Sequence, residues 1–342
     1  MQYELRTQVI EPVRHTFQNL IDRAGDRSAS RYAEGTVGVQ PRENFHYRPL
    51  WDPEHEVYDE HYSALRLADP DGFADPRQYY YTPYVAARAG LHDVFGKTLV
   101  YLEERDLLAR MPESWRTLLA TCVLPLRHYE SGGQLISVNG ARFAYGTSVE
   151  QCLSFAAFDR IGLAQMLSRV GIAVAGGADE GLVAAKRSWI EATHLQGLRR
   201  LVEELLVEPD WATGVLGLDL VDRLLYPLLY RHLDEVALLQ GAGAHSLLAQ
   251  HFSAWYADQR KWVDALLTAW TSDTEHGEGN RAALRTTVDT WLPRAREAVT
   301  ALAGEIDAVV VGADAAKYVQ QCGEAIPEEL GLLGLPMKQG AQ

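Results

Sequence analysis

Residues 149–170 read VEQCLSFAAFDRIGLAQMLSRV, and their apolar side chains recur at helical spacing. A neighbouring face of the same predicted helix is also apolar, which is typical of a helix deep inside a protein. We therefore expect this helix to be buried on most sides. The first stripe consists of Val149, Leu153, Ala156, Leu163, Leu167 and Val170, and the neighbouring face of Phe155, Phe158, Ile161 and Met166.

Arg160 lies in the middle of this apolar stripe. A guanidinium stays charged at any relevant pH, and burying it without a partner is energetically costly. We therefore expect Arg160 to find a carboxylate on a neighbouring helix. The alternative is that its long side chain snorkels to a hydrated edge. The apolar residues that continue on both sides favour the buried ion pair.

The composition favours an all-α fold, because Ala and Leu are abundant and long β-branched runs are scarce. With 342 residues and 47% hydrophobic residues, the chain can build a large core. The net charge of -14 argues against nucleic acid or an anionic membrane as a partner. No leader pattern or membrane-length apolar run is visible, and three scattered cysteines fit reduced thiols, so we expect a cytoplasmic protein.

Helical patterns extend from Asp75-Pro76 almost to the end of the chain, and no linker divides it. We expect a tail that is loose after Pro327, and three parts: residues 1–56 (a short helix and an extended arm), 57–325 (a helical domain) and 326–342 (the tail). The predicted helices cover 12–24, 76–110 with a bend near Pro83, 112–140, 145–174, 179–191, 194–208, 211–239, 244–271, 281–303 and 313–323, with a loop at 272–280.

Each of the four long helices after residue 112 has one polar side chain in the middle of an apolar stripe. These are Glu130, Arg160, Arg223 and Gln259. Their helices are long enough to meet at mid-height, which is the arrangement of a bundle with a central site. The pattern predicts that Glu130 pairs with Arg160 or with Arg223.

The central set does not have the composition of a metal site. A di-iron bundle uses a Glu from each of two helices and Glu-x-x-His from each of the other two. Here Arg160 and Gln259 are followed three residues later by Leu163 and Trp262, and Glu130 with the two arginines sums to +1, which repels a cation. Two Glu-x-x-His strings, Glu43–His46 and Glu191–His194, lie outside the four helices and are expected to be surface pairs.

Residues 26–56 lack helical periodicity but are rich in aromatic residues and proline. Such a segment indicates an extended arm whose rings dock on another surface. It either folds back on its own domain or lies on a partner chain. The candidate interface residues are Phe45, His46, Tyr47, Arg48, Leu50 and Trp51.

Several long and distinctive strings resemble the β subunit of bacterial multicomponent phenol hydroxylases, in the soluble di-iron monooxygenase family. The resemblance runs nearly end to end and implies a ferritin-like helical bundle with extra outer helices. It is carried by Ala29-Ser30-Arg31-Tyr32, residues 44–53, Ala74-Asp75-Pro76-Arg77-Gln78, Pro125-Leu126-Arg127-His128 with Glu130, Gln196-Gly197-Leu198-Arg199-Arg200, residues 260–265, and Pro293-Arg294-Ala295.

The resemblance also implies what the central residues replace. The iron-bearing α subunits carry Asp-Glu-x-Arg-His-x-Gln on their third helix, and residues 159–165 look like that string with the ligands changed to Arg160 and Leu163. A later Asp-Glu-x-Arg-His is similar to residues 258–262, with Gln259 and Trp262 at the ligand positions. Glu130 stands where the first iron-binding Glu would be, and Arg223 falls close to the remaining one. The resemblance therefore implies a chain without a metal site or cofactor of its own.

The implied function is a non-catalytic scaffold for the α subunit, which holds the di-iron centre. The implied assembly is an (αβγ)2 hydroxylase that takes electrons from NADH through a reductase, acts with a coupling protein and hydroxylates phenol or a related arene. A toluene- or benzene-type monooxygenase β subunit is an alternative within the family. An active metal-binding ferritin-like oxygenase and a free-standing helical adaptor remain as alternatives from other classes.

Overall fold

The computed structural model describes residues 18–25, 29–41 and 48–337. This part of the chain is helical and contains no β-strand, which confirms the all-α prediction. None of its helices is long and apolar enough to cross a membrane. The α-helices are α1 (Gln18–Ala24), α2 (Arg31–Thr36), α3 (Tyr81–Glu104), α4 (Glu113–Leu118), α5 (Arg127–Phe143), α6 (Thr147–Val174), α7 (Glu180–Glu191), α8 (Thr193–Leu206), α9 (Trp211–Pro227), α10 (Leu233–Leu239), α11 (Gly243–Ser272), α12 (Gly277–Val309) and α13 (Ala315–Leu332).

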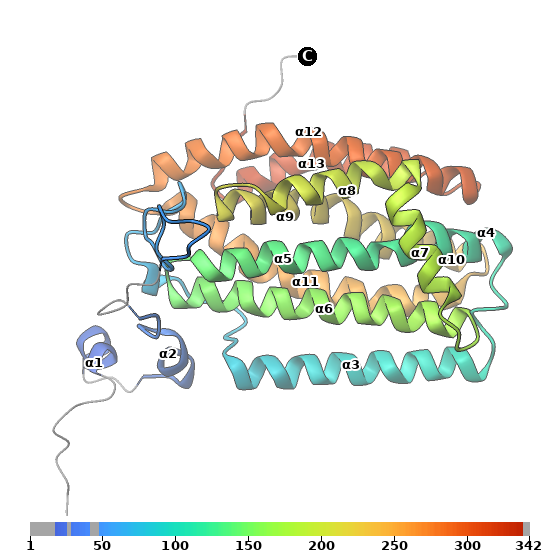
Figure 1. Cartoon of the computed structure of the whole chain (residues 1–342), viewed down its shortest axis with the longest axis horizontal. Coiled ribbons are helices and arrows are strands. Elements are labelled where there is room, and N and C mark those ends of the chain that lie inside the picture. Colours follow the sequence, from blue (N-terminus) through green and yellow to red (C-terminus); the bar gives the residue numbers. More distant parts are fainter. Residues whose placement is uncertain (1–17, 26–28, 42–47, 338–342) are drawn as a thin grey trace, which may run out of the picture.

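The centre of the molecule is a bundle of four helices, α5, α6, α9 and α11. Helix α5 packs on α6 and on α9. Helix α11 also packs on α6 and α9, opposite α5, and completes the bundle. Helices α12, α8 and α13 cover α9, whereas α3 lies along α6 at the opposite edge (Figure 1). These four central helices are the ones whose stripes carry a single polar residue, so the predicted bundle is confirmed.

Two of the predicted long helices are interrupted, which the sequence analysis did not anticipate. Residues 112–140 comprise α4, a π-helical segment (Leu119–Val123), a 3-10 segment (Leu124–Leu126) and α5. Residues 211–239 comprise α9, a π-helical segment (Leu228–His232) and α10. A proline stands at each interruption, Pro125 in one and Pro227 in the other. Proline has no N–H and disturbs the regular hydrogen-bond ladder, which explains both breaks.

The ends of the helical region also differ from the prediction. Helix α3 begins at Tyr81 rather than at residue 76, and Pro83 lies in its first turn, where proline is tolerated. Helix α13 continues through Pro327 to Leu332. Leu330 and Leu335 are buried, so the chain beyond Pro327 is packed and is not a loose tail as far as residue 337. Apolar burial holds this segment although proline removes one hydrogen bond.

Local signals explain other helix boundaries. The carboxylate of Asp210 accepts hydrogen bonds from the N–H groups of Ala212 and Thr213 and caps the start of α9. Helix α6 ends before Gly176 and Gly177, whose φ angles of 64° and 95° favour glycine. The three cysteines are free: Cys122 and Cys152 are buried and Cys322 is half-buried. Burial raises the pKa of the Cys122 thiol to about 12, which keeps it protonated.

Candidate functional site: a buried arginine in the bundle centre

Arg160 lies halfway along α6 and is only 1% exposed. Its Nη1 donates to Glu130 Oε2 of α5 at 2.8 Å, and its Nη2 forms an ion pair with Asp222 of α9. The prediction that Arg160 is buried and paired, with Glu130 as one partner, is confirmed. Asp222 is a second partner that the sequence analysis missed. We call Glu130, Arg160 and Asp222 the central triad.

Aromatic side chains enclose the central triad. The Tyr226 hydroxyl donates to Glu130 Oε1 at 2.6 Å, and the Tyr129 hydroxyl donates to Asp222 Oδ1 at 2.6 Å. The Arg160 guanidinium carbon lies 5.0 Å from the ring centroid of Trp255, within cation–π range. Each carboxylate of the triad therefore accepts one hydrogen bond from arginine and one from tyrosine. This pairing makes the burial of three charges possible.

The same burial sets the electrostatics of the triad. Loss of water raises the pKa of Glu130 and of Asp222, although Arg160 opposes this shift. Burial would lower the pKa of Arg160, but the two carboxylates outweigh it and hold that pKa well above the usual value. With both carboxylates ionised, the triad has a formal charge of −1. The expected central charge of +1 was wrong, because it included Arg223 and left out Asp222.

Arg223 belongs to a separate group of charges, which we call the peripheral cluster. Its Nε lies 2.9 Å from Asp219, and its other nitrogens lie 2.8 Å from Asp264 and 3.0 Å from Glu329. Arg260 pairs with the same Asp219 and Asp264. Successive helical residues are rotated by about 100°, so Arg223 faces away from the triad that its neighbour Asp222 joins. The predicted alternative, a pair between Glu130 and Arg223, is therefore wrong.

The other positions of the predicted centre hold neutral groups. Gln259 and Trp262 of α11 are buried, and the Trp262 Nε1 donates to the Gln259 Oε1 at 2.8 Å. Leu163 is buried among apolar neighbours one turn after Arg160. None of these three side chains is charged, and Gln259 satisfies the indole N–H of Trp262.

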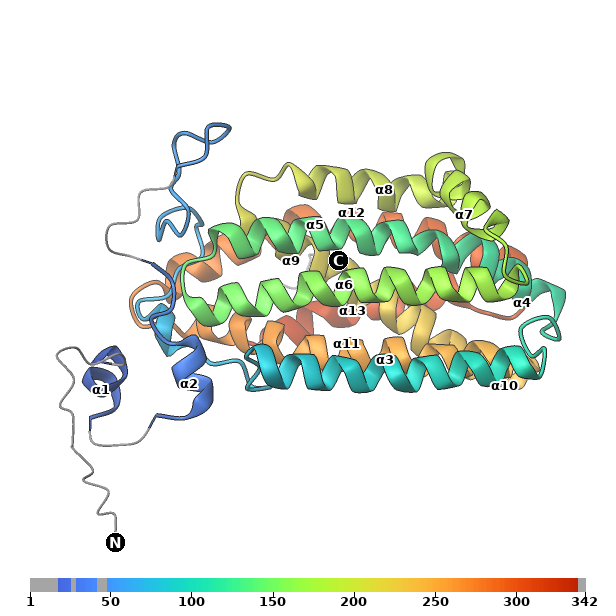
Figure 2. The same ribbon diagram turned by 60° about the horizontal axis from the view of Figure 1, so that its bottom comes forward.

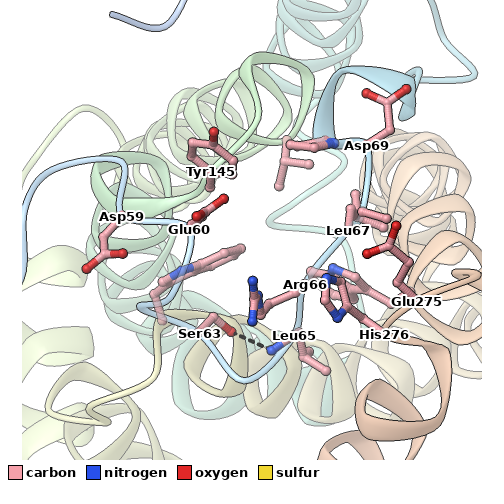
Figure 3. Close-up of a pocket in the computed structure, with 15 residues that line it drawn as sticks. Asp59, Glu60, Ser63, Leu65, Arg66, Leu67, Asp69, Tyr145, Glu275 and His276 are labelled. Atoms are coloured by element: carbon pink, nitrogen blue, oxygen red, sulfur yellow. Dashed lines mark hydrogen bonds between the residues drawn. The ribbon is translucent and has the colours of Figure 1, made fainter. Parts of the chain in front are cut away.

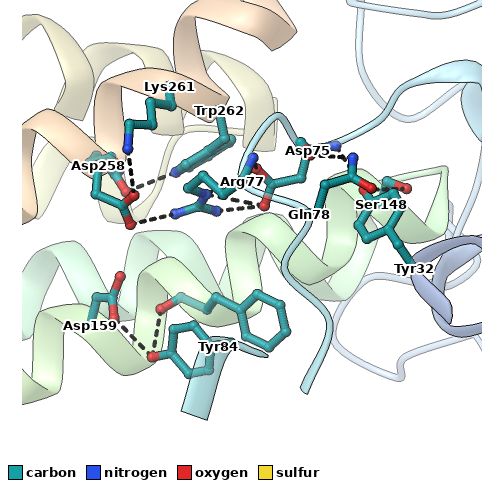
Figure 4. Close-up of polar contacts among 12 residues, drawn as sticks. Tyr32, Asp75, Arg77, Gln78, Tyr84, Ser148, Asp159, Asp258, Lys261 and Trp262 are labelled. Carbon is teal, nitrogen blue, oxygen red and sulfur yellow. Dashed lines mark hydrogen bonds and ion pairs between the residues drawn. The ribbon is translucent and has the colours of Figure 1, made fainter. Parts of the chain in front are cut away.

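A third ionic network joins α3, α6 and α11. Figure 4 shows its members Arg77, Asp159 and Asp258. Arg88 of α3 bonds Asp159 of α6 at 2.7 Å and Asp258 of α11 at 2.7 Å. Arg77, just before α3, bonds Asp75 at 2.9 Å and lies 3.6 Å from Asp258. The helical stripes did not predict this network. The available signal was that Asp159 and Asp258 precede the two altered ligand positions, 160 and 259.

The donor set of the bundle centre does not fit a di-iron centre. Such a centre needs several carboxylates and two imidazoles directed at one point. Here a guanidinium stands between Glu130 and Asp222, and it already engages an oxygen of each. Within residues 18–25, 29–41 and 48–337, no group of three or more His, Cys, Asp or Glu side chains is placed to hold a metal ion.

The two Glu-x-x-His strings have different outcomes. Glu43–His46 includes residues that lie outside the described part of the chain, so that prediction stays open. Glu191 is exposed at the end of α7, and His194 lies in the first turn of α8. The His194 Nε2 is 3.1 Å from the carbonyl oxygen of Thr121, and its Nδ1 is 3.8 Å from Glu305. His194 is therefore a helix-packing residue and not a partner of Glu191.

The candidate arm residues are only partly described, because Phe45, His46 and Tyr47 lie outside the described residues. Arg48 pairs with Glu56 at 3.0 Å, and Leu50 is fully exposed. The Trp51 ring packs edge-on against Phe143 at the end of α5, yet Trp51 remains 63% exposed. This part of the arm therefore docks on its own bundle while it keeps two large apolar side chains in solvent.

A hollow of about 380 Å³ opens at the end of the bundle near residues 59–70 (Figure 3). Its lining combines carboxylates such as Glu60 and Glu275 with the rings of Trp211 and Trp270. The Arg66 side chain points into it, and its guanidinium has no ion-pair partner among the described residues. This hollow lies at one end of the bundle, away from the middle of α6 where Arg160 stands, and no sequence pattern predicted it.

Comparison with known proteins agrees with this architecture. Residues 51–274 match the family model described as Methane/Phenol/Alkene Hydroxylase. The chain is 37% identical over 306 residues to the phenol 2-monooxygenase oxygenase component DmpL of Pseudomonas sp. strain CF600, covering 89% of this chain and 92% of that protein. It is 24% identical to the small subunit of the propane 2-monooxygenase hydroxylase component of Mycolicibacterium smegmatis, over 88% of each chain.

A solved structure gives the same result. The crystal structure of xenon-pressurised phenol hydroxylase from Pseudomonas sp. OX1 contains a chain that superposes with a TM-score of 0.87 at 32% identity, covering 98% of this chain and 99% of that one. The match therefore extends to the outer helices as well as the central bundle. The chain belongs to the methane/phenol/alkene hydroxylase family and is of the phenol/toluene monooxygenase type.

Proposed function

We propose that this chain is the non-catalytic scaffold subunit of a multicomponent arene hydroxylase. In this role it packs against an iron-bearing oxygenase subunit, where O2 and the arene react. Phenol is the proposed substrate of the assembly, because two relatives at 35–37% identity are named as phenol 2-monooxygenase components. The names of other relatives refer to a small subunit and a subunit beta of hydroxylase components, which supports a larger partner.

The observation that carries this proposal is the position of Arg160. A buried guanidinium between Glu130 and Asp222 occupies the middle of the four-helix bundle. A cation placed there would meet an existing positive charge, and both carboxylates would have to exchange arginine and tyrosine hydrogen bonds for metal bonds. The ion pairs instead join α5, α6 and α9 without a metal. The proposed contribution of this chain is therefore a rigid, metal-independent body for its partner.

The test is the metal content of the chain, alone and in its complex. We expect the purified chain to contain less than about 0.1 iron per chain and to form a stable complex with a co-expressed iron-bearing subunit, while all the iron stays with that partner. Size-exclusion chromatography with elemental analysis of the separated subunits measures both quantities. Near-stoichiometric iron in the isolated chain would overturn the scaffold proposal in favour of an active oxygenase or a metal-storage bundle. A chain that never joins the partner would favour a free-standing adaptor.

A further inference from the structure

Helices α5, α6 and α3 lie side by side and leave one broad surface uncovered (Figure 2). Helix α6 is in the middle and packs on α5 along one edge and on α3 along the other. The remaining central helices, α9 and α11, lie behind this row. The outward surface of the row therefore runs along the long axis of the molecule, over almost the full length of α6.

This surface exposes large apolar side chains, contrary to the expectation that α6 is buried on most sides. Phe158 is 56% exposed and Ile161 is 42% exposed, although both were predicted to face the interior. Ile172 continues the same side of α6, and Leu135 extends it onto α5. Tyr81 and Val85 extend it onto α3 at 72% and 42% exposure. A group of exposed apolar residues on adjacent helices is typical of an interaction surface.

The first half of α3 and most of α5 and α6 lack acidic residues on this surface, in a chain with a net charge of -14, whereas the second half of α3 carries Asp93, Glu103 and Glu104. Residues 81–92 and 131–142 contain no Asp or Glu, and residues 154–172 contain only Asp159, which is buried and paired with Arg88. At the average frequency in this chain, 46 acidic residues in 342, these 43 residues would hold about six. Charge depletion together with apolar exposure is the composition of an interface core. We call the outward surface of residues 81–92, 131–142 and 154–172 the uncharged face.

We propose that the uncharged face is the surface on which the iron-bearing subunit packs, an inference that rests on the proposed function. The uncharged part of α6, residues 154–172, is about 28 Å long, and three helices side by side span roughly 25–30 Å, so the face offers on the order of 800 Å². Burying it together with a partner surface of equal size removes about 1,600 Å² from water, which is the standard size of a specific, stable interface.

Charge complementarity favours a different partner over a second copy of this chain. The uncharged face has two exposed charges, Arg142 on α5 and Arg169 on α6 between Ile161 and Ile172, and neither has an ion-pair partner among the described residues. A second copy would bring the same unpaired arginines and another net charge of -14 to the contact. A partner with an apolar helical face and carboxylates opposite the two arginines would match both features.

The experiment places a single charge on the face and compares it with the same change elsewhere. Phe158→Glu and Ile161→Glu test the face, and Val207→Glu and Leu239→Glu are matched controls at exposed apolar positions outside these three helices. Each variant is co-expressed with the iron-bearing subunit, and the complex is quantified by size-exclusion chromatography with light scattering. We expect at least tenfold less complex for Phe158→Glu and Ile161→Glu, and wild-type amounts for the controls.

The outcomes separate this inference from the proposed function. If both face variants co-elute with the partner like wild type, the uncharged face is not the contact, although the subunit role stands. If wild type itself forms no complex, the proposed function fails first. If wild type alone is a dimer that Phe158→Glu converts to a monomer, the face pairs two copies and the inference is overturned. Unchanged circular dichroism melting of the variants excludes unfolding, and Phe158→Gln replaces Phe158→Glu if the latter does not fold.

Discussion

The central triad and the peripheral cluster both join helices by arginine–carboxylate pairs, but they differ in access to water. In the triad the side chains are 1–3% exposed. In the peripheral cluster Arg223 and Asp219 are 4% and 7% exposed, but Asp264 is 34% and Glu329 is 52% exposed, beside a hollow of about 440 Å³. Each pair in the triad must therefore be complete, whereas solvent can replace a missing partner in the cluster. Removing one partner of an arginine–carboxylate pair should therefore cost more free energy of unfolding in the central triad than in the peripheral cluster.

The strongest way to test this difference is to remove the arginine from each group. We expect Arg160→Met to lower the free energy of unfolding by about 3–5 kcal/mol, because it leaves two carboxylates buried without a counter-charge. Arg223→Met is the matched control, with an expected loss of about 1–2 kcal/mol, since Asp219 and Asp264 keep Arg260 and Glu329 reaches solvent. Urea denaturation followed by circular dichroism measures both. Equal losses would show that the two groups do not differ in this way.

A smaller effect is expected from two tyrosines that stack on each other at 5.1 Å. Tyr226 donates to Glu130, so Tyr226→Phe leaves a buried carboxylate oxygen without this hydrogen bond and should lower stability by about 1–3 kcal/mol. The Tyr256 hydroxyl makes no hydrogen bond within the described residues and borders the hollow, so Tyr256→Phe should change stability by less than about 0.5 kcal/mol. Thermal unfolding of both variants provides the measurement. A larger loss in Tyr256→Phe would contradict the assignment.

The smallest expected effect is a difference in pH dependence. The folded-state pKa of Glu130 is raised above its ordinary value of 4.5 by burial, so wild type loses stability relative to Glu130→Gln as the pH rises above 4.5. Burial also acts on Asp219, but Arg260 and Arg223 outweigh it and lower its pKa below 3.8. Wild type therefore keeps its advantage over Asp219→Asn above pH 3.8 and loses it in more acidic solution. Urea titrations from pH 3 to 8 should give these opposite slopes, and slopes of the same sign would refute the assignment.

The Glu130→Gln variant also revises an expectation based on the sequence alone. If Glu130 were the sole partner of Arg160, its neutralisation would leave a buried cation unpaired and cost about 3–5 kcal/mol. Because Asp222 remains paired with Arg160, and glutamine can still accept a hydrogen bond, we expect a smaller loss. The smaller expected loss is due to Asp222, which lies outside the apolar stripe of residues 211–239.

Helical periodicity was sufficient to predict the all-α fold, the four central helices and the buried ion pair of Arg160. Each of these depends on a regular spacing of apolar residues within a single helix, which can be read locally. The prolines at the two breaks, Pro125 and Pro227, are local signals of an interrupted helix. The apolar pattern continues across both prolines, so a single long helix was predicted in each case. The continuation of α13 through Pro327 had no such signal, because it depends on packing against other helices.

By itself, the sequence determined that a guanidinium stands in the middle of a helical bundle and that it needs a carboxylate, because its charge cannot be removed by titration. Only the tertiary structure decided which carboxylates are used and where the apolar surface ends. A rotation of about 100° between Asp222 and Arg223 places one in the centre and the other at the periphery. Likewise Phe158 and Ile161 have the pattern of core residues but are exposed, because no described helix covers that side of α6. The choice of ion-pair partner and the exposure of Phe158 and Ile161 depend on how the helices are placed around one another. The apolar pattern of one helix contains no information about that placement.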